Sequence, residues 1–207
     1  MGKKLRLLGL IVIASLIMQV NIALLKRYNG YRPFLYNYTV DGCRYLQNPD
    51  RHVEFTNVKC ESLDKTFSDF EYCYIKAINR SYKYVSIKVN LFKTPVTKVK
   101  VNFLVMKRFN GYRPFLYNIT VDACKFIENP NRNPIAHYLS DLFLPYTNLV
   151  HKCPYNHSLI MDKLPIDHIN NQFTNVLPFP TGDYALCTSW MAYDINRANI
   201  KVFLTLS

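Results

Sequence analysis

The sequence predicts a mainly β fold, an immunoglobulin-like two-sheet β-sandwich with one short helix. Composition is the first indication, because 49% of the 207 residues are hydrophobic and 14% are aromatic, nearly all Tyr and Phe. Such residues favour strands. The second indication is the pattern, because apolar and polar residues alternate over roughly eight short segments with proline-rich corners between them. A chain of this length suits one domain with a substantial core.

Alternation of apolar and polar residues defines the expected strands. They comprise residues 53–59, 70–78, 85–91, 99–105, 115–121, 158–164, 173–177, 184–193 and 200–206. The period changes once, after Pro134, where apolar residues fall at helical spacing: Ile135, Tyr138, Leu139, Leu142 and Phe143. Pro145 ends this run, so the one helix is expected here.

One stretch of the chain occurs twice. Residues 20–51 and 101–132 align at an offset of 81 positions, with about 20 of 32 identical. Within the second copy, Asn110-Gly111 separates two alternating runs, which is a strong hairpin signal because both residues tolerate positive φ. The second copy has strands before it and a helix after it, so it is expected to be the central hairpin of a sandwich domain at 53–207. The first copy, at 24–52, is expected to be a peripheral partial duplicate.

The amino terminus resembles a secretory leader. Lys3, Lys4 and Arg6 precede an apolar run from Leu7, which predicts a signal peptide at 1–23, or a signal anchor over 7–25 if cleavage fails. Asn-x-Ser/Thr sequons follow, at Asn37, Asn79, Asn118 and Asn156. Together they predict a secreted, extracellular glycoprotein that meets a membrane only if the leader is uncleaved.

Cysteine usage fits that compartment. The chain has six cysteines, an even number that predicts disulfides in a secreted protein without fixing which residues pair. Cys43 exists only because of the duplication, so we expect it to lack a well-placed partner. Cys187 is the residue we expect to remain unpaired.

No catalytic constellation is recognisable. The chain lacks a nucleophile elbow, a phosphate-binding glycine loop and a dinucleotide fingerprint, so we predict no enzyme activity and no cofactor. His151, Cys153 and His157, with His137 nearby, could imitate a metal site. Structural zinc needs four convergent ligands, and a cysteine flanked by loop histidines fits a disulfide better, so no metal is expected. The net charge is +12, but the basic residues are spread along the chain, which argues against a nucleic-acid partner.

An apolar ligand site is the remaining candidate. Large side chains occupy the expected inward positions of the strands: Phe103, Phe115, Tyr117, Ile119, Tyr184, Leu186 and Trp190. These residues are tentative pocket residues, since ordinary core packing uses the same residue types. Alternation alone leaves both interpretations open.

Several motifs carry a resemblance to a known family. They are FNGYRPFLYNITVDACKF, HKCPYNH, LPFPTGDY, and Trp190, Tyr193 and Arg197 in combination, preceded by FTNVKCESLDKTFSDFEYCYIKAINRSYKYVS. Over about residues 53–207 the chain resembles a large family of small secreted insect proteins, catalogued as a domain of unknown function. That family is similar to the ML lipid-recognition proteins, which include ganglioside-activator-like and insect chemosensory B proteins.

The resemblance implies an immunoglobulin-like sandwich with an apolar pocket between its sheets and stabilising disulfides. Four cysteines match the family's positions: Cys60, Cys73, Cys124 and Cys153. The copy of NGYRPFLYN at 28–37 has no place in the family pattern, and Cys187 also departs from it.

Two functions follow as expectations. The first is a secreted, non-enzymatic protein that holds a small apolar ligand, a lipid or hydrocarbon semiochemical, between two sheets. The alternative is an extracellular interaction protein without a cavity, whose basic surface engages a receptor or an acidic glycan.

Overall fold

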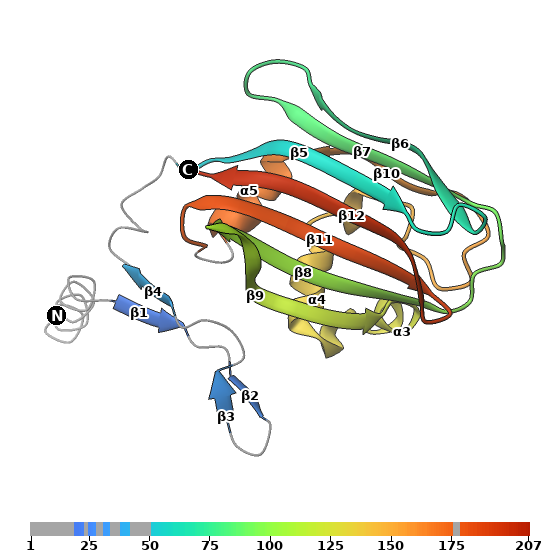
Figure 1. Ribbon diagram of the computed structural model, residues 1–207, viewed down its shortest axis with the longest axis horizontal. Helices are drawn as coiled ribbons and strands as arrows, with labels where there is room; N and C mark the ends of the chain where they lie inside the picture. Colours follow the sequence, from blue (N-terminus) through green and yellow to red (C-terminus); the bar gives the residue numbers. More distant parts are fainter. Residues whose placement is uncertain (1–18, 23–24, 28–30, 34–37, 42–50, 176–178) are drawn as a thin grey trace, which may run out of the picture.

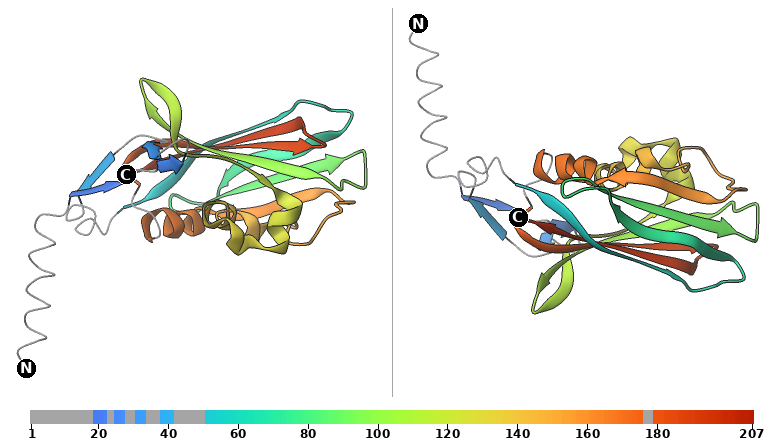
Figure 2. Two further views of the ribbon diagram at one scale, coloured as in Figure 1. Left: turned by 90° about the horizontal axis from the view of Figure 1, so that it is seen from below. Right: turned by 90° about the horizontal axis from the view of Figure 1, so that it is seen from above.

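Two antiparallel sheets packed face to face form the body of the protein, as predicted (Figure 1, Figure 2). The computed structural model describes residues 19–22, 25–27, 31–33, 38–41, 51–175 and 179–207. The larger sheet has the order β5 (Val53–Ser62), β12 (Ile195–Leu206), β11 (Gly182–Ala192), β8 (Val99–Phe109), β9 (Gly111–Asp122). The smaller sheet has the order β10 (Leu159–Pro165), β7 (Lys83–Leu91), β6 (Ser68–Ala77).

Strand register decides which side chains face the second layer. On β8 and β11, Phe103 pairs with Thr188 and Val105 with Leu186. Directly paired residues share a face, so these side chains all point inward. Phe103 and Val105 are buried, whereas their neighbour Leu104 is only partly buried. The period-2 alternation that predicted the strands is therefore the alternation that builds the core.

The two hairpins of the larger sheet turn where local sequence allows. The β8–β9 hairpin turns at Asn110-Gly111, as predicted, and Gly111 has a φ of 103°, a value that favours glycine. The expectation that this hairpin is central was wrong, because β9 is an edge strand of the larger sheet. The β11–β12 hairpin turns through Tyr193 and Asp194, whose φ values of 54° and 64° match a type I′ turn. Two-residue turns of this kind suit the right-handed twist of the strands that they join.

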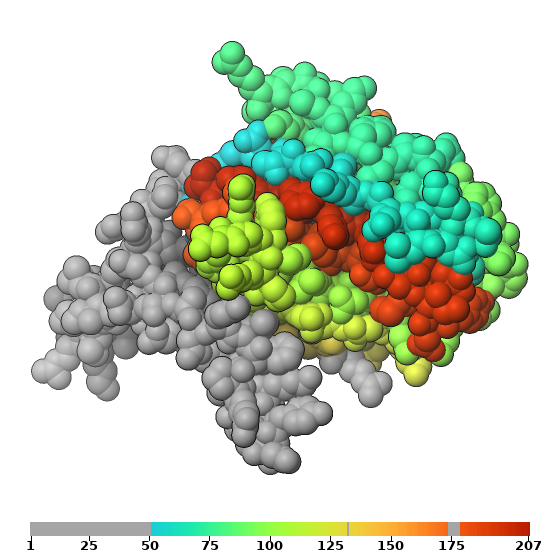
Figure 3. Space-filling model, in the orientation of Figure 1, coloured from blue at the N-terminus to red at the C-terminus, as the bar shows by residue number. Residues whose placement is uncertain are grey.

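The β8–β9 hairpin leaves the plane of the sheet at a β-bulge. The register shifts between Leu104 and Met106, and opposite this shift Leu116 takes a positive φ of 64°. Beyond the bulge the hairpin stands on the outer face of the sheet (Figure 3). There the Tyr112 ring packs edge-on against Phe203 of β12, with ring centroids 5.4 Å apart. A bulge bends the strand that carries it, which accounts for the change of direction.

Helices complete the second layer beside the smaller sheet (Figure 2). The predicted helix is α4 (Pro134–Asp141), which Asn133 caps by accepting a hydrogen bond from the Ala136 N–H. Two helices were not predicted, α3 (Ala123–Glu128) and α5 (Ile166–Asn175). Two single turns of 3₁₀-helix flank α4, η1 (Pro130–Arg132) and η2 (Leu144–Tyr146).

The strand predicted at 173–177 is wrong over residues 173–175, because α5 continues to Asn175. The helix is favoured by burial of Ile166, Ile169 and Phe173, which recur at helical spacing and are at most 2% exposed. Residues 176–178 lie outside the described residues.

The first copy of the repeat forms two small ladders. Strand β1 (Gln19–Ile22) pairs with β4 (Tyr38–Asp41), and β2 (Leu25–Arg27) pairs with β3 (Tyr31–Pro33). In the described part of the chain, neither ladder is hydrogen-bonded into a sandwich sheet. That the first copy is a peripheral duplicate remains a prediction. Residues 1–18 of the leader predicted at 1–23 lie outside the described residues, as does Cys43.

Candidate ligand cavity

An apolar cavity of about 200 Å³ lies between the two layers. Its wall takes residues from both sheets and from the α4 region, for example Phe55, Ile87, Leu139, Met161 and Leu186. Ligand pockets usually measure roughly 300–1,000 Å³, so this one suits a small or slender molecule. An apolar space of this order can admit small apolar molecules.

Three aromatic side chains form one side of the cavity wall. Phe143 lies between Phe103 and Trp190, at centroid distances of 6.1 and 6.5 Å. The indole N–H of Trp190 donates to the Thr188 hydroxyl at 2.9 Å, which satisfies its one donor inside the wall. Most of this surface can therefore contact a ligand through dispersion and burial of apolar area.

The structure divides the seven tentative pocket residues into two groups. Phe103, Leu186 and Trp190 line the cavity. The other four do not: Phe115, Tyr117, Ile119 and Tyr184. Phe115 packs instead against Tyr184, with ring centroids 5.9 Å apart. Tyr184 in turn packs against Phe173 and Phe179, at centroid distances of 6.4 and 5.6 Å. Whether the first three bind a ligand remains a prediction.

Arg197 is the one charged residue among the described side chains that line the cavity. Its side chain is 16% exposed and forms an ion pair with Asp64. Its guanidinium carbon lies 4.5 Å from the centroid of the Phe67 ring, which is a cation–π contact. Hydrogen bonds from Thr66 and Arg197 hold the pKa of Asp64 below its ordinary value, so this carboxyl is ionised at neutral pH.

Loops gather at the end of the sandwich near Arg197. A small apolar cluster there, Phe67, Val96, Tyr155 and Ala192, adjoins the cavity and contributes to its wall. Burial raises the pKa of the Tyr155 phenol, and its hydroxyl donates to the carbonyls of Leu149 and His151. The cavity therefore reaches this loop end of the molecule.

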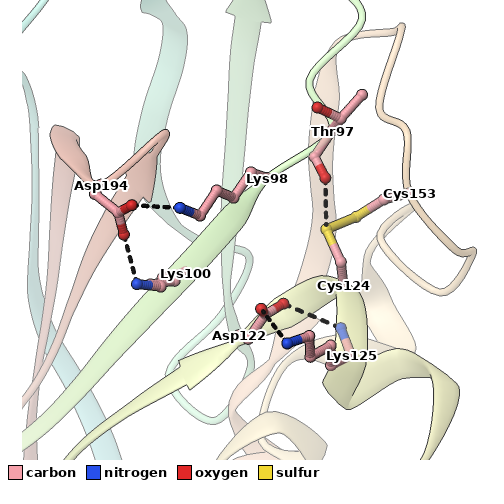
Figure 4. Close-up of polar contacts among 8 residues, drawn as sticks. All are labelled: Thr97, Lys98, Lys100, Asp122, Cys124, Lys125, Cys153 and Asp194. Atoms are coloured by element: carbon pink, nitrogen blue, oxygen red, sulfur yellow. Dashed lines mark hydrogen bonds and ion pairs between the residues drawn. A yellow bond between two sulfur atoms is a disulfide. The ribbon is translucent and has the colours of Figure 1, made fainter.

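Ion pairs and a disulfide secure the same end (Figure 4). Asp194, in the β11–β12 turn, contacts the ammonium groups of Lys98 and Lys100 on β8. The bond between Cys124 and Cys153 ties α3 to the loop after η2. These contacts hold the loops that surround the cavity end.

Comparison with protein families covers most of this domain. The model for proteins of unknown function DUF1091 matches residues 20–73 and 101–186. The chain belongs to the DUF1091 family. The match includes both copies of the repeat, so the expectation that the first copy has no place in the family pattern was wrong. It also includes β5, most of β8 and the first half of β11, but not β7 or β12.

Among solved structures, this DUF1091 chain is similar to a Niemann-Pick type C2 protein from the Japanese carpenter ant. The two share 16% sequence identity, and the similarity covers 73% of this chain and 90% of the other, with a TM-score of 0.29. No curated protein matched the DUF1091 chain.

The four predicted disulfide cysteines pair in the structure. Cys60 bonds to Cys73, and Cys124 bonds to Cys153. Cys187 is free and buried in the described part of the DUF1091 chain, as expected. Its register partner is Leu104, so it faces the outer side of the sheet, with its sulfur 3.7 Å from that of Met106. Burial raises the pKa of this thiol, which makes it a poor nucleophile.

The histidines considered for a metal site lie together without forming one. The Nε2 atoms of His151 and His157 are 2.7 Å apart, but Cys153 is committed to its disulfide. Within the described residues, no group of three potential ligands could hold a metal ion. In the same part of the chain, no helix is long and apolar enough to span a membrane.

Three predicted glycosylation sites fall within the described residues. Asn79, Asn118 and Asn156 are all exposed, in the β6–β7 turn, on β9 and in the loop before β10. Asn37 lies outside the described residues. Modification of these asparagines remains a prediction.

Sequence reasoning missed part of the cavity wall. Leu139, Leu142 and Phe143 line it, and their helical spacing had already been recognised, so helix amphipathicity could have identified them. Arg197 could not be found in this way. In a strand without a bulge, the Arg197 side chain would point to the outer face of the sheet, because its neighbour Ala198 points inward.

Proposed function

We propose that this protein is a secreted, non-enzymatic, ML-like binding protein for a small apolar ligand, such as a lipid or hydrocarbon semiochemical. The observation that carries the proposal is the apolar cavity between the sheets. Family membership supports it only indirectly, through the resemblance of that family to lipid-recognition proteins. Each methylene transferred from water into the cavity contributes about 0.8 kcal/mol to binding.

The cavity also weighs against the alternative of a solid sandwich that acts through its basic surface. That alternative needs no internal space, and filling the cavity would not affect it. The net charge of +12 still favours acidic partners, so retention on heparin that falls with added salt would support it.

The first experiment measures ligand content and uptake. The protein is expressed through a secretory pathway, purified, extracted with organic solvent and analysed by mass spectrometry. Uptake of the neutral fluorophore N-phenylnaphthylamine is then measured by titration. We expect recovery of an apolar molecule or saturable uptake of the fluorophore. Absence of both would overturn the proposal.

Filling the cavity tests whether uptake occurs at this site. Leu186 lines the cavity, and Leu186→Trp would occupy its space, so we expect fluorophore affinity to fall by about tenfold or more. Leu63→Trp is the matched control, because Leu63 is 48% exposed and outside the cavity wall. Equal affinity in both variants would place the fluorophore elsewhere.

A further inference from the structure

Arg197 reaches the cavity because of a β-bulge in β12. Trp190 pairs with Ala198, but the next residue, Met191, pairs with Asn196, so Arg197 is an extra residue opposite no partner. The bulge interrupts the strict alternation of inward and outward positions along β12, and Arg197 and Ala198 both border the cavity. Bulges commonly re-aim a side chain in this way next to functional sites.

The guanidinium of Arg197 has a buried donor without a partner. Its Nη1 is paired with Asp64, and its face lies against Phe67. Its Nε is buried and has no hydrogen-bond partner, the one such nitrogen or oxygen among the described cavity-lining side chains. A buried donor that lacks an acceptor is unfavourable, and native structures rarely tolerate one.

The charge around this donor is already balanced. Asp64 remains ionised, since hydrogen bonds keep its pKa low, and it neutralises Arg197. A ligand carboxylate placed beside Nε would meet the negative charge of Asp64, which is ion-paired to the same guanidinium. An uncharged oxygen acceptor would meet no such repulsion.

We propose that Arg197 is the polar recognition site of the cavity, and that the ligand is a slender apolar chain carrying an uncharged oxygen acceptor. Ketones, aldehydes, esters and alcohols belong to this class. The acceptor oxygen takes the hydrogen bond of Nε, while the chain extends along the apolar wall towards Phe103 and Leu186. This inference rests on the proposed function, and it goes beyond it by separating oxygenated chains from hydrocarbons and fatty-acid anions.

Competition among ligands of equal chain length tests the inference. Dodecane, dodecanol, dodecanone and dodecanoate are each used to displace N-phenylnaphthylamine from the wild-type protein. We expect the alcohol and the ketone to bind roughly tenfold or more tightly than the alkane, as a hydrogen bond to a charged donor would give. The carboxylate should bind more weakly than the ketone.

Two substitutions of Arg197 separate recognition from packing. Arg197→Met keeps an unbranched apolar stem and removes every donor, so the ketone should lose its advantage over the alkane. Arg197→Lys keeps the charge without a donor at the Nε position, so it should recover little of that advantage. Retained fluorophore uptake in either variant shows that the cavity is intact.

Asp64→Asn tests the role of the counter-charge, because it removes the negative charge beside Arg197 and leaves the Arg197 donors in place. The amide can still accept from Thr66, so the local turn is kept, but Arg197 loses its counter-charge. We expect dodecanoate to gain at least tenfold relative to dodecanone in this variant.

The outcomes distinguish the two proposals. If the wild-type protein takes up the fluorophore but binds the alkane and the ketone equally, the cavity binds ligands and the role of Arg197 is refuted. A ketone preference that survives Arg197→Met would also refute it. If the protein takes up no fluorophore, or if none of the four C12 ligands displaces it, the proposed function itself fails.

Discussion

At the scale of single residues, the sequence indicated only part of the cavity. Alternation placed Phe103, Leu186 and Trp190 on the inner face, because register and periodicity agree along β8 and β11. The same alternation could not distinguish cavity wall from solid core, so Phe115 and Tyr184 were grouped with them. Arg197 is invisible to any periodic argument, because a bulge shifts it by one position.

Asp194 is the residue for which a pH effect can be stated. Hydrogen bonds from Lys100 and Lys98 lower its pKa from the ordinary 3.8 to about 2. A carboxyl whose pKa is lower in the folded state than in the unfolded state stabilises the fold at any pH above its unfolded-state pKa. This stabilisation is lost as the pH falls through the folded-state pKa.

We therefore predict that Asp194→Asn loses the acid-dependent part of this stabilisation. Between about pH 4 and pH 2, the melting temperature of the wild-type protein should fall more steeply than that of the variant. Thermal melts in low-salt buffers would measure this, since salt screens such exposed pairs. Parallel curves for the two proteins would contradict the prediction.

At the scale of elements, the strands were predicted well and the helices poorly. Most strands have a buried face and a solvated face, which alternation reports directly. Helix α5 was missed because its three buried residues are separated by polar ones, and the short run around Phe173 was interpreted as a strand. Short apolar runs do not distinguish the two structures until their neighbours are known.

The two disulfides should contribute unequally to stability. Cys124 and Cys153 are separated by 29 positions, whereas Cys60 and Cys73 are separated by 13. In the chain-entropy model the longer loop gives the larger effect, by about 0.7 kcal/mol.

We predict that the double substitution of Cys124 and Cys153 by Ala lowers the free energy of unfolding. It should do so by more than the double substitution of Cys60 and Cys73 by Ala. Denaturant titrations of the two double variants would measure the difference. The first variant should also take up less fluorophore, because its loops border the cavity. The opposite order of stabilities would show that local packing outweighs loop closure.

At the scale of the whole molecule, the sandwich was predictable but its strand order was not. The alternating segments indicate two sheets, yet nothing in their periodicity shows that β5, the first strand of the sandwich, pairs with β12, the last. Backbone hydrogen bonds of 3.0 Å run both ways between His52 and Ser207, so the two ends of the domain meet. Such long-range pairing is decided by the shape of the complete core.

This closure predicts strong dependence on the final strand. Leu204 is fully buried in β12, so Leu204→Ala should lower the free energy of unfolding by about 2–5 kcal/mol. Lys201→Ala, on the exposed face of the same strand, should change it by no more than about 0.5 kcal/mol. Urea titration compares the two, and similar losses would show that β12 is not held by its buried face.

The position of β12 also bears on how the protein is made. It lies between β5 and β11, and it is the last part of the domain to leave the ribosome. Until it emerges, β5 and β11 each present an unpaired strand edge, which is the kind of surface through which growing chains associate. The larger sheet can therefore be completed only after β12 has emerged, which makes the time before its emergence the period of greatest vulnerability to aggregation.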